Sequence, residues 1–104
     1  MSGNTVRLQA VLTAKQTLRH TPAGLPMIDI TVSHASQQTE AGQQRQVSFE
    51  MEAKAAGDLA LRISALPPGT TLLMEGFLNR RHRLSRQMVL HVTGIGKTNE
   101  PHRD

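Results

Sequence analysis

The chain has 104 residues, enough for one domain with a modest core, and it has no cysteine, which excludes a disulfide framework and a thiolate zinc site. No apolar run approaches the roughly 20 residues of a membrane helix, and the first residues, MSGNTVRLQA, lack the features of a secretion signal, so we expect a cytoplasmic protein. The net charge is +4 and nine of the twelve basic residues are arginine, which favours a polyanionic partner such as a nucleic acid.

The first third of the chain predicts two strands joined by a tight turn. Apolar residues alternate with other residues over residues 5–13 and again over residues 26–34, which is the period of a half-buried strand. Between these runs, the sequence TPAG at residues 21–24 carries turn chemistry, because proline fixes φ and glycine tolerates positive φ. The whole stretch from Arg19 to Val32 therefore predicts the turn and second strand of a β-hairpin.

A polar segment and a third strand follow. Residues 35–43 are polar and contain Glu40-Ala41-Gly42, so we expect a loop there. Residues 44–52 alternate again, and Phe49 shares a face with Val47 and Met51. We therefore expect Phe49 to lie in the core.

The pattern changes to a helical one at Ala53. Apolar residues then recur at spacings of four, four and three, which are typical of one helix face: Ala55, Leu59, Ile63 and Leu66. The sequence PPG at residues 67–69 ends this helix. Alternation resumes over residues 70–79, whose charge-free face we assign to the core, and over residues 87–95. The last residues, 98–104, are expected to form a disordered tail.

The expected order is three strands, a short helix and two further strands. This order matches an OB-fold, a small five-stranded Greek-key barrel with one short helix between strands three and four. Closing the barrel removes exposed sheet edges. We therefore predict an all-β protein whose residues 1–97 form a single OB-fold domain.

The densest charge cluster lies between the fourth and fifth strands. Residues 80–86, RRHRLSR, hold four arginines and no acid. In OB-folds this loop (L45) and the loop between strands one and two (L12) flank the face that binds oligonucleotides. Arginine can bind phosphate bidentately and stack on bases. The residues predicted to bind single-stranded DNA are Lys15, Arg19, His20, Phe77, Arg80, Arg81, Arg83 and Arg86.

Aromatic residues are scarce, because the chain has two phenylalanines and neither tryptophan nor tyrosine. Single-strand binders usually stack bases on aromatic rings. Phe77 shares its face with Glu75 and precedes the basic loop, so it is the candidate stacking platform. If both phenylalanines are buried, phosphate contacts must supply the affinity, and binding should depend strongly on salt.

The sequence gives little sign of catalysis or of metal binding. The five histidines lack metal-ligand spacing. No nucleophile–base arrangement, carboxylate pair or phosphate-binding glycine loop stands out. We therefore predict a protein that is not an enzyme and that has no metal or cofactor.

Four stretches, in their order and spacing, carry a resemblance to a known family: residues 19–26, 34–46, 75–78 and 88–91. Over most of its length the chain resembles the primosomal replication protein N (PriB) family, which is related to bacterial single-stranded DNA-binding proteins. The resemblance implies a non-catalytic OB-fold homodimer that binds single-stranded DNA. It also implies a role in restarting stalled replication forks through the helicase PriA and the protein DnaT. DnaT is not present in every organism that has a member of this family.

The resemblance carries over to particular positions. The family's L12 lysine falls at Arg19, and its L45 lysines fall within residues 80–86. Two positions depart from the family: Ala35 stands where a basic residue is usual, and Ser48 stands where an exposed tryptophan is usual. Both departures remove expected contacts to DNA.

Three alternatives to a restart protein that binds single-stranded DNA remain open. A general single-stranded DNA-binding protein usually carries a long region ending in an acidic, aromatic-tipped tail, and residues 100–104, EPHRD, do not resemble one. A protein–protein adaptor with vestigial DNA binding would fit the departures at Ala35 and Ser48. An RNA-binding OB-fold would have a similar groove, because grooves that follow the backbone discriminate poorly between the two polymers.

Overall fold

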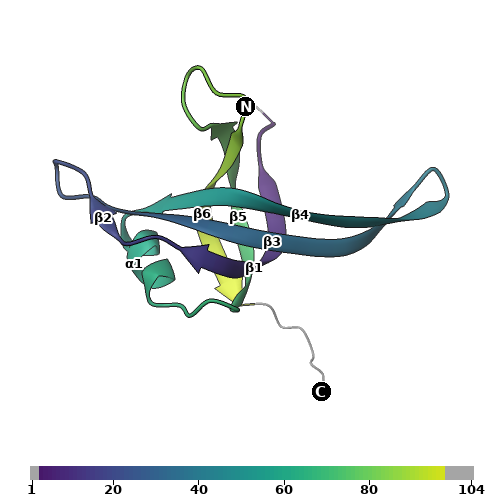
Figure 1. The fold of residues 1–104 in the computed structure, drawn as a ribbon, viewed down its shortest axis with the longest axis horizontal. Helices are drawn as coiled ribbons and strands as arrows, with labels where there is room; N and C mark the ends of the chain where they lie inside the picture. Colours follow the sequence, from purple (N-terminus) through teal and green to yellow (C-terminus); the bar gives the residue numbers. More distant parts are fainter. Residues whose placement is uncertain (1–2, 98–104) are drawn as a thin grey trace.

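The computed structural model describes residues 3–97, which form six strands and one short helix (Figure 1). The elements are β1 (Val6–Lys15), β2 (Arg19–His20), β3 (Pro26–Glu40), β4 (Gln43–Ala56), α1 (Asp58–Ser64), β5 (Thr71–Arg80) and β6 (Met88–Lys97). The predicted order of five long strands with a helix after the third is confirmed. The short strand β2 was not predicted, and it places the helix between β4 and β5 in this numbering.

The five long strands close into a barrel. The sheet has the order β1-β5-β6-β4-β3-β2, and an additional pairing joins β1 to β3. β1 pairs with β5 through its first half and with β3 through its second half. A short parallel pairing between β4 and β6, at Glu52–Lys54 against Val89–His91, completes the ring. The all-β barrel predicted from the element order is therefore the observed fold.

Alternation along the strands fills the barrel with apolar side chains. The largest fully buried side chains come from five different elements: Leu12, Ile28, Val32, Ile63, Leu72, Met74 and Leu90. The predicted inward face of β5 is confirmed, because Leu72, Met74 and Gly76 are buried. No polar or charged residue among those described is buried, so hydrophobic burial stabilises the core.

The helix is shorter than predicted. β4 continues to Ala56, and α1 runs only from Asp58 to Ser64. Ala55 is therefore a strand residue, and Leu66 lies beyond the helix, although both pack with the core. Ala53 and Ala55 alternate into the barrel with 1% and 3% exposure. The helical spacing was misleading because strand residues and helix residues both point their apolar side chains at one core.

A long two-stranded arm replaces the predicted loop at residues 35–43. Pairing between β3 and β4 continues without interruption from Met27–Ala56 to Glu40–Gln43. Figure 1 shows this hairpin extending well beyond the barrel. Ala41 and Gly42 both have positive φ, 52° and 78°, as in the type I′ turns that close two-residue hairpins. We call residues 34–49 the β-arm. Backbone pairing between its two strands holds it together, so its polar residues need no contact with the core.

The prediction that Phe49 lies in the core is wrong. Phe49 is 40% exposed, and its ring rests against His34, with 5.1 Å between ring centroids. β1 pairs with β3 only as far as Ser33, so Phe49 lies where the arm has already left the barrel. Alternation identifies the face of a strand but not the point at which the core ends.

The predicted tail at residues 98–104 lies outside the described residues. Among the described residues, no helix is long and apolar enough to cross a membrane.

Candidate nucleic-acid interface

Two adjoining cavities lie on the outer side of the barrel, between β2 and the loop after β5. The first has a volume of about 250 Å³, and its walls include Arg19, Asp29 and Glu52. The second has a volume of about 310 Å³, and its walls include Arg80, Arg83 and His91. Both are lined by Lys54, Arg81 and His82, so they form one continuous depression, which we call the groove.

One wall of the groove is set by the turn after β2. Arg19 pairs with Met27 of β3, which fixes the register of this short strand. The turn is closed by hydrogen bonds from the Thr21 amide to the Leu25 carbonyl (2.9 Å) and from the Gly24 amide to the Thr21 carbonyl (2.8 Å). The Leu25 amide also donates to the Thr21 hydroxyl, at 3.1 Å. The turn chemistry in TPAG thus holds Arg19 at the groove.

The opposite wall is the L45 loop, which in the structure spans residues 81–87, between β5 and β6. Its base is closed by the Arg81 amide, which donates to the Gln87 carbonyl at 2.9 Å. Within it, the Ser85 amide donates to the His82 carbonyl at 2.9 Å. Arg80 Nη1 donates to the Arg83 carbonyl at 2.8 Å. These bonds give the arginine-rich segment a defined shape.

The sheet between these walls presents a row of aligned side chains. Asp29 on β3 lies opposite Lys54 on β4, which lies opposite His91 on β6, which lies opposite Phe77 on β5. The rings of Phe77 and His91 stack, with 4.8 Å between centroids and 8° between planes. Burial, and secondly the charge of Lys54, lowers the pKa of His91, so its imidazole is neutral at pH 7. A neutral, stacked aromatic pair therefore adjoins a cation.

Two ion pairs cross the first cavity. Arg19 pairs with Asp29, and Arg81 pairs with Glu52. All four side chains remain partly exposed, between 32% and 48%. Within residues 3–97 no ion pair involves Lys54, Arg80 or Arg83. The groove therefore contains both neutralised and unneutralised cations.

Comparison with known proteins identifies the family. Residues 4–94 match a family described as "another single-strand binding protein family". The replication restart protein PriB of Nitrosomonas europaea is 40% identical over 89 residues, which are 86% of this chain and 82% of the relative. PriB of Neisseria gonorrhoeae is 36% identical over 92 residues, or 88% and 91% of the two chains. The chain belongs to the PriB family of replication restart proteins.

A solved structure supports the same assignment. The PriB structure from Ralstonia solanacearum superposes with a TM-score of 0.84 at 36% identity, over 93% of this chain and 100% of that chain. The OB-fold predicted from the element order is thereby confirmed. Family membership also confirms the prediction of a non-catalytic protein, because PriB and its single-strand-binding relatives are not enzymes.

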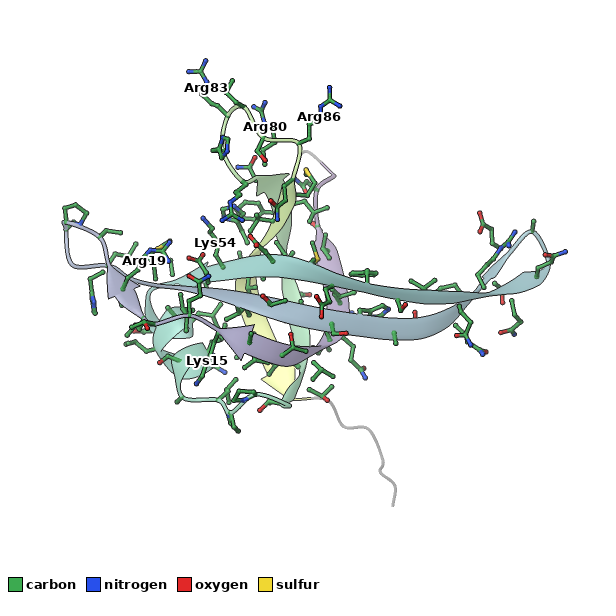
Figure 2. All side chains as sticks on the ribbon, viewed as in Figure 1. Lys15, Arg19, Lys54, Arg80, Arg83 and Arg86 are labelled. Atoms are coloured by element: carbon green, nitrogen blue, oxygen red, sulfur yellow. The ribbon has the colours of Figure 1, made fainter. Side chains whose placement is uncertain are left out.

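For this PriB-family chain, the structure brings together four of the predicted residues and leaves others apart. Arg19, Arg80, Arg81 and Arg83 line the groove, and Phe77 adjoins it through His91. Figure 2 shows Arg19 and Lys54 on the sheet, with Arg80, Arg83 and Arg86 around the L45 loop above them. His20 and Arg86 are exposed but line neither cavity.

The structure places Lys15 apart from the residues that line the groove. Its Nζ donates to the Ser64 carbonyl at 2.5 Å, at the end of α1. Figure 2 places this side chain near α1, away from the L45 loop. A cation is favourable there because the last carbonyls of a helix are unsatisfied and partly negative. Lys15 therefore joins β1 to the helix.

Sequence reasoning missed Lys54 and His91. Lys54 was not predicted because the third strand was predicted to end at Glu52, so the outward position two residues later was assigned to a helix. Extending the alternation by two residues would have found it. For His91 the signal was the alternation over residues 87–95, which places it on the strand face opposite Leu90 and Val92. Within the described residues, no cluster of His, Asp and Glu side chains could hold a metal ion.

Proposed function

We propose that this chain binds single-stranded DNA in the groove, as a PriB of the replication-restart machinery. The observation that carries the proposal is the convergence of five cations from three parts of the chain: Arg19, Lys54, Arg80, Arg81 and Arg83. The family match to single-strand binding proteins supports the same ligand. A groove of this charge suits a phosphate backbone and has no acid along its second cavity.

In the proposed mode, the cations hold phosphates and the aromatic pair receives a base. Arginine guanidinium groups can bind phosphate oxygens bidentately, whereas Lys54 acts as a point charge. Phe77 is 38% exposed and can stack a base beside the L45 loop. Affinity should then be strongly dependent on salt and weakly dependent on sequence, because phosphates carry no sequence information.

We further propose that the chain acts with protein partners: the helicase PriA, DnaT where it is present, and a second copy of itself in a homodimer. Membership of the replication-restart family supports the first two. The homodimer is supported by the start of β1, where residues 6–8 have a strand partner, among the described residues, on one side only. The cytoplasm, where replication takes place, is the proposed location.

The test is binding of a fluorescent dT oligonucleotide across a salt series. The wild type should bind with an affinity that falls steeply with salt, and the variant Arg80→Glu/Arg81→Glu/Arg83→Glu should lose binding. Absent or mutation-insensitive binding at low salt would contradict the proposal and favour the adaptor. A pull-down with PriA separates the two readings, because the adaptor retains PriA in the same variant. A matched rU oligonucleotide tests the RNA alternative.

A further inference from the structure

The groove carries its own negative charge. Asp29 and Glu52 line the first cavity. Among the described residues that line the groove, these two are the acidic ones. Each is already paired with an arginine that the proposed function assigns to phosphate binding: Arg19 or Arg81. Asp29 also lies directly across from Lys54 on the neighbouring strand. The two carboxylates are therefore paired with two of the five groove cations.

These pairs are weak enough to exchange. Exposed ion pairs contribute at most about 1 kcal/mol, and all four side chains here are about a third to a half exposed. A phosphate can therefore displace either carboxylate from its arginine. The displaced carboxylate stays anchored to the floor of the groove, where it repels the incoming phosphate.

We propose that Asp29 and Glu52 are affinity-setting residues that compete with DNA phosphate for Arg19 and Arg81. The inference rests on the proposed function, because it concerns the same groove and ligand. In this arrangement Lys54, Arg80 and Arg83 engage phosphates directly, whereas Arg19 and Arg81 engage them by exchange. The result is a strand held less tightly than the number of cations predicts, and released more easily.

The exchange has a signature in the salt dependence. Each phosphate that binds a fully hydrated cation releases counterions and steepens the slope of log K against log[salt] by about 0.7 for a single strand. A phosphate that displaces a carboxylate leaves a new negative charge that takes up a cation. The net ion release at Arg19 and Arg81 is therefore smaller than at Arg83.

The alternative role for Asp29 and Glu52 is to position the two arginines. If the carboxylates hold the arginines in the geometry that DNA requires, removing them should weaken binding. The two roles predict changes of opposite sign, so a single measurement separates them.

The experiment measures binding of a fluorescent dT oligonucleotide across a salt series for the wild type, Asp29→Asn, Glu52→Gln and the double variant. The control is Glu75→Gln, which removes the same charge from an exposed ion pair with Arg7 that lines neither groove cavity. The substitutions Asp29→Asn and Glu52→Gln keep the side-chain shape. Thermal unfolding verifies that each variant is folded.

Each groove variant should bind about twofold to fivefold more tightly than Glu75→Gln, the range expected for one exposed ion pair. The salt slope should steepen by up to about 0.7 per carboxylate removed. If wild type binds but the groove variants bind no better than the control, the inference is overturned and the proposed function stands. If neither the wild type nor any variant binds at low salt, the inference and the proposed function are both overturned.

Discussion

The ring of Phe77 lies against the imidazole of His91, with 4.8 Å between centroids and 8° between planes. The two residues are direct cross-strand neighbours on β5 and β6. The stacking contact holds the Phe77 ring on the outer face of the barrel, where 38% of the residue remains exposed. An aromatic surface of this kind, beside a basic loop, is suited to receive a base.

Replacing Phe77 with alanine should therefore weaken binding of a dT oligonucleotide. Stacking on one aromatic ring is worth about 1–3 kcal/mol per base, so we expect a loss of about tenfold or more in affinity. The matched control is Phe49→Ala, which removes an equally exposed ring from the β-arm. Equal losses in the two variants, measured by fluorescence anisotropy, would contradict the assignment of the base to Phe77.

Lys54 provides a second test, because it was found only in the structure. Lys54→Glu places a negative charge where both cavities of the groove meet. We expect affinity for single-stranded DNA to fall by about tenfold at low salt and the difference to shrink at high salt. Arg45→Glu, the same change in charge at the far end of the β-arm, should have little effect. A larger effect from Arg45→Glu would move the binding surface to the arm.

The lowered pKa of His91 predicts a pH dependence of stability. Burial and the charge of Lys54 disfavour the protonated imidazole in the folded protein, whereas the unfolded chain takes up the proton near the usual pKa of 6.5. The stabilisation is therefore present above pH 6.5 and is lost as the pH falls through 6.5 toward the lower folded pKa. Urea unfolding at pH 7.5 and pH 5.5 should show a larger loss for the wild type than for His91→Gln. Equal losses would refute the prediction.

Replacing Gly76 with alanine should strongly destabilise the folded protein. A Cβ at this position would lie 1.9 Å from the His91 carbonyl oxygen, at an irregularity in the β5–β6 pairing. Because backbone atoms cannot move aside cheaply, Gly76→Ala should destabilise the protein by about 2 kcal/mol or more. Gly94→Ala is the control, since its Cβ would have no closer contact than 4.0 Å, to Glu75. Similar urea midpoints for the two variants would contradict the predicted clash.

The strands and their order were predictable from sequence because each long strand has one face in a single closed core. Leu72 and Met74 were assigned correctly on that basis. The β-arm was not predictable, because residues 35–46 have no buried face and their pairing rests on backbone hydrogen bonds. Phe49 was misplaced for the same reason: its alternation continues past the edge of the core.

The site was only partly predictable. Arg80, Arg81 and Arg83 stand out as a run, and the fold order places that run opposite Arg19. The pairing of Arg81 with Glu52 joins residues 29 apart in sequence and follows from the short β4–β6 contact. Lys15 was grouped with Arg19 because it lies near the predicted L12 loop in sequence, whereas in the structure its side chain contacts the end of α1.

The most direct test of the central claim is to map where DNA lies on the protein. In an NMR titration of ¹⁵N-labelled protein with a short dT oligonucleotide, the largest shift changes should fall at Arg19, Lys54, His91 and the L45 loop. Signals from the tip of the β-arm should move little. Changes confined to the β-arm, or no changes at low salt, would contradict the groove as the DNA-binding site.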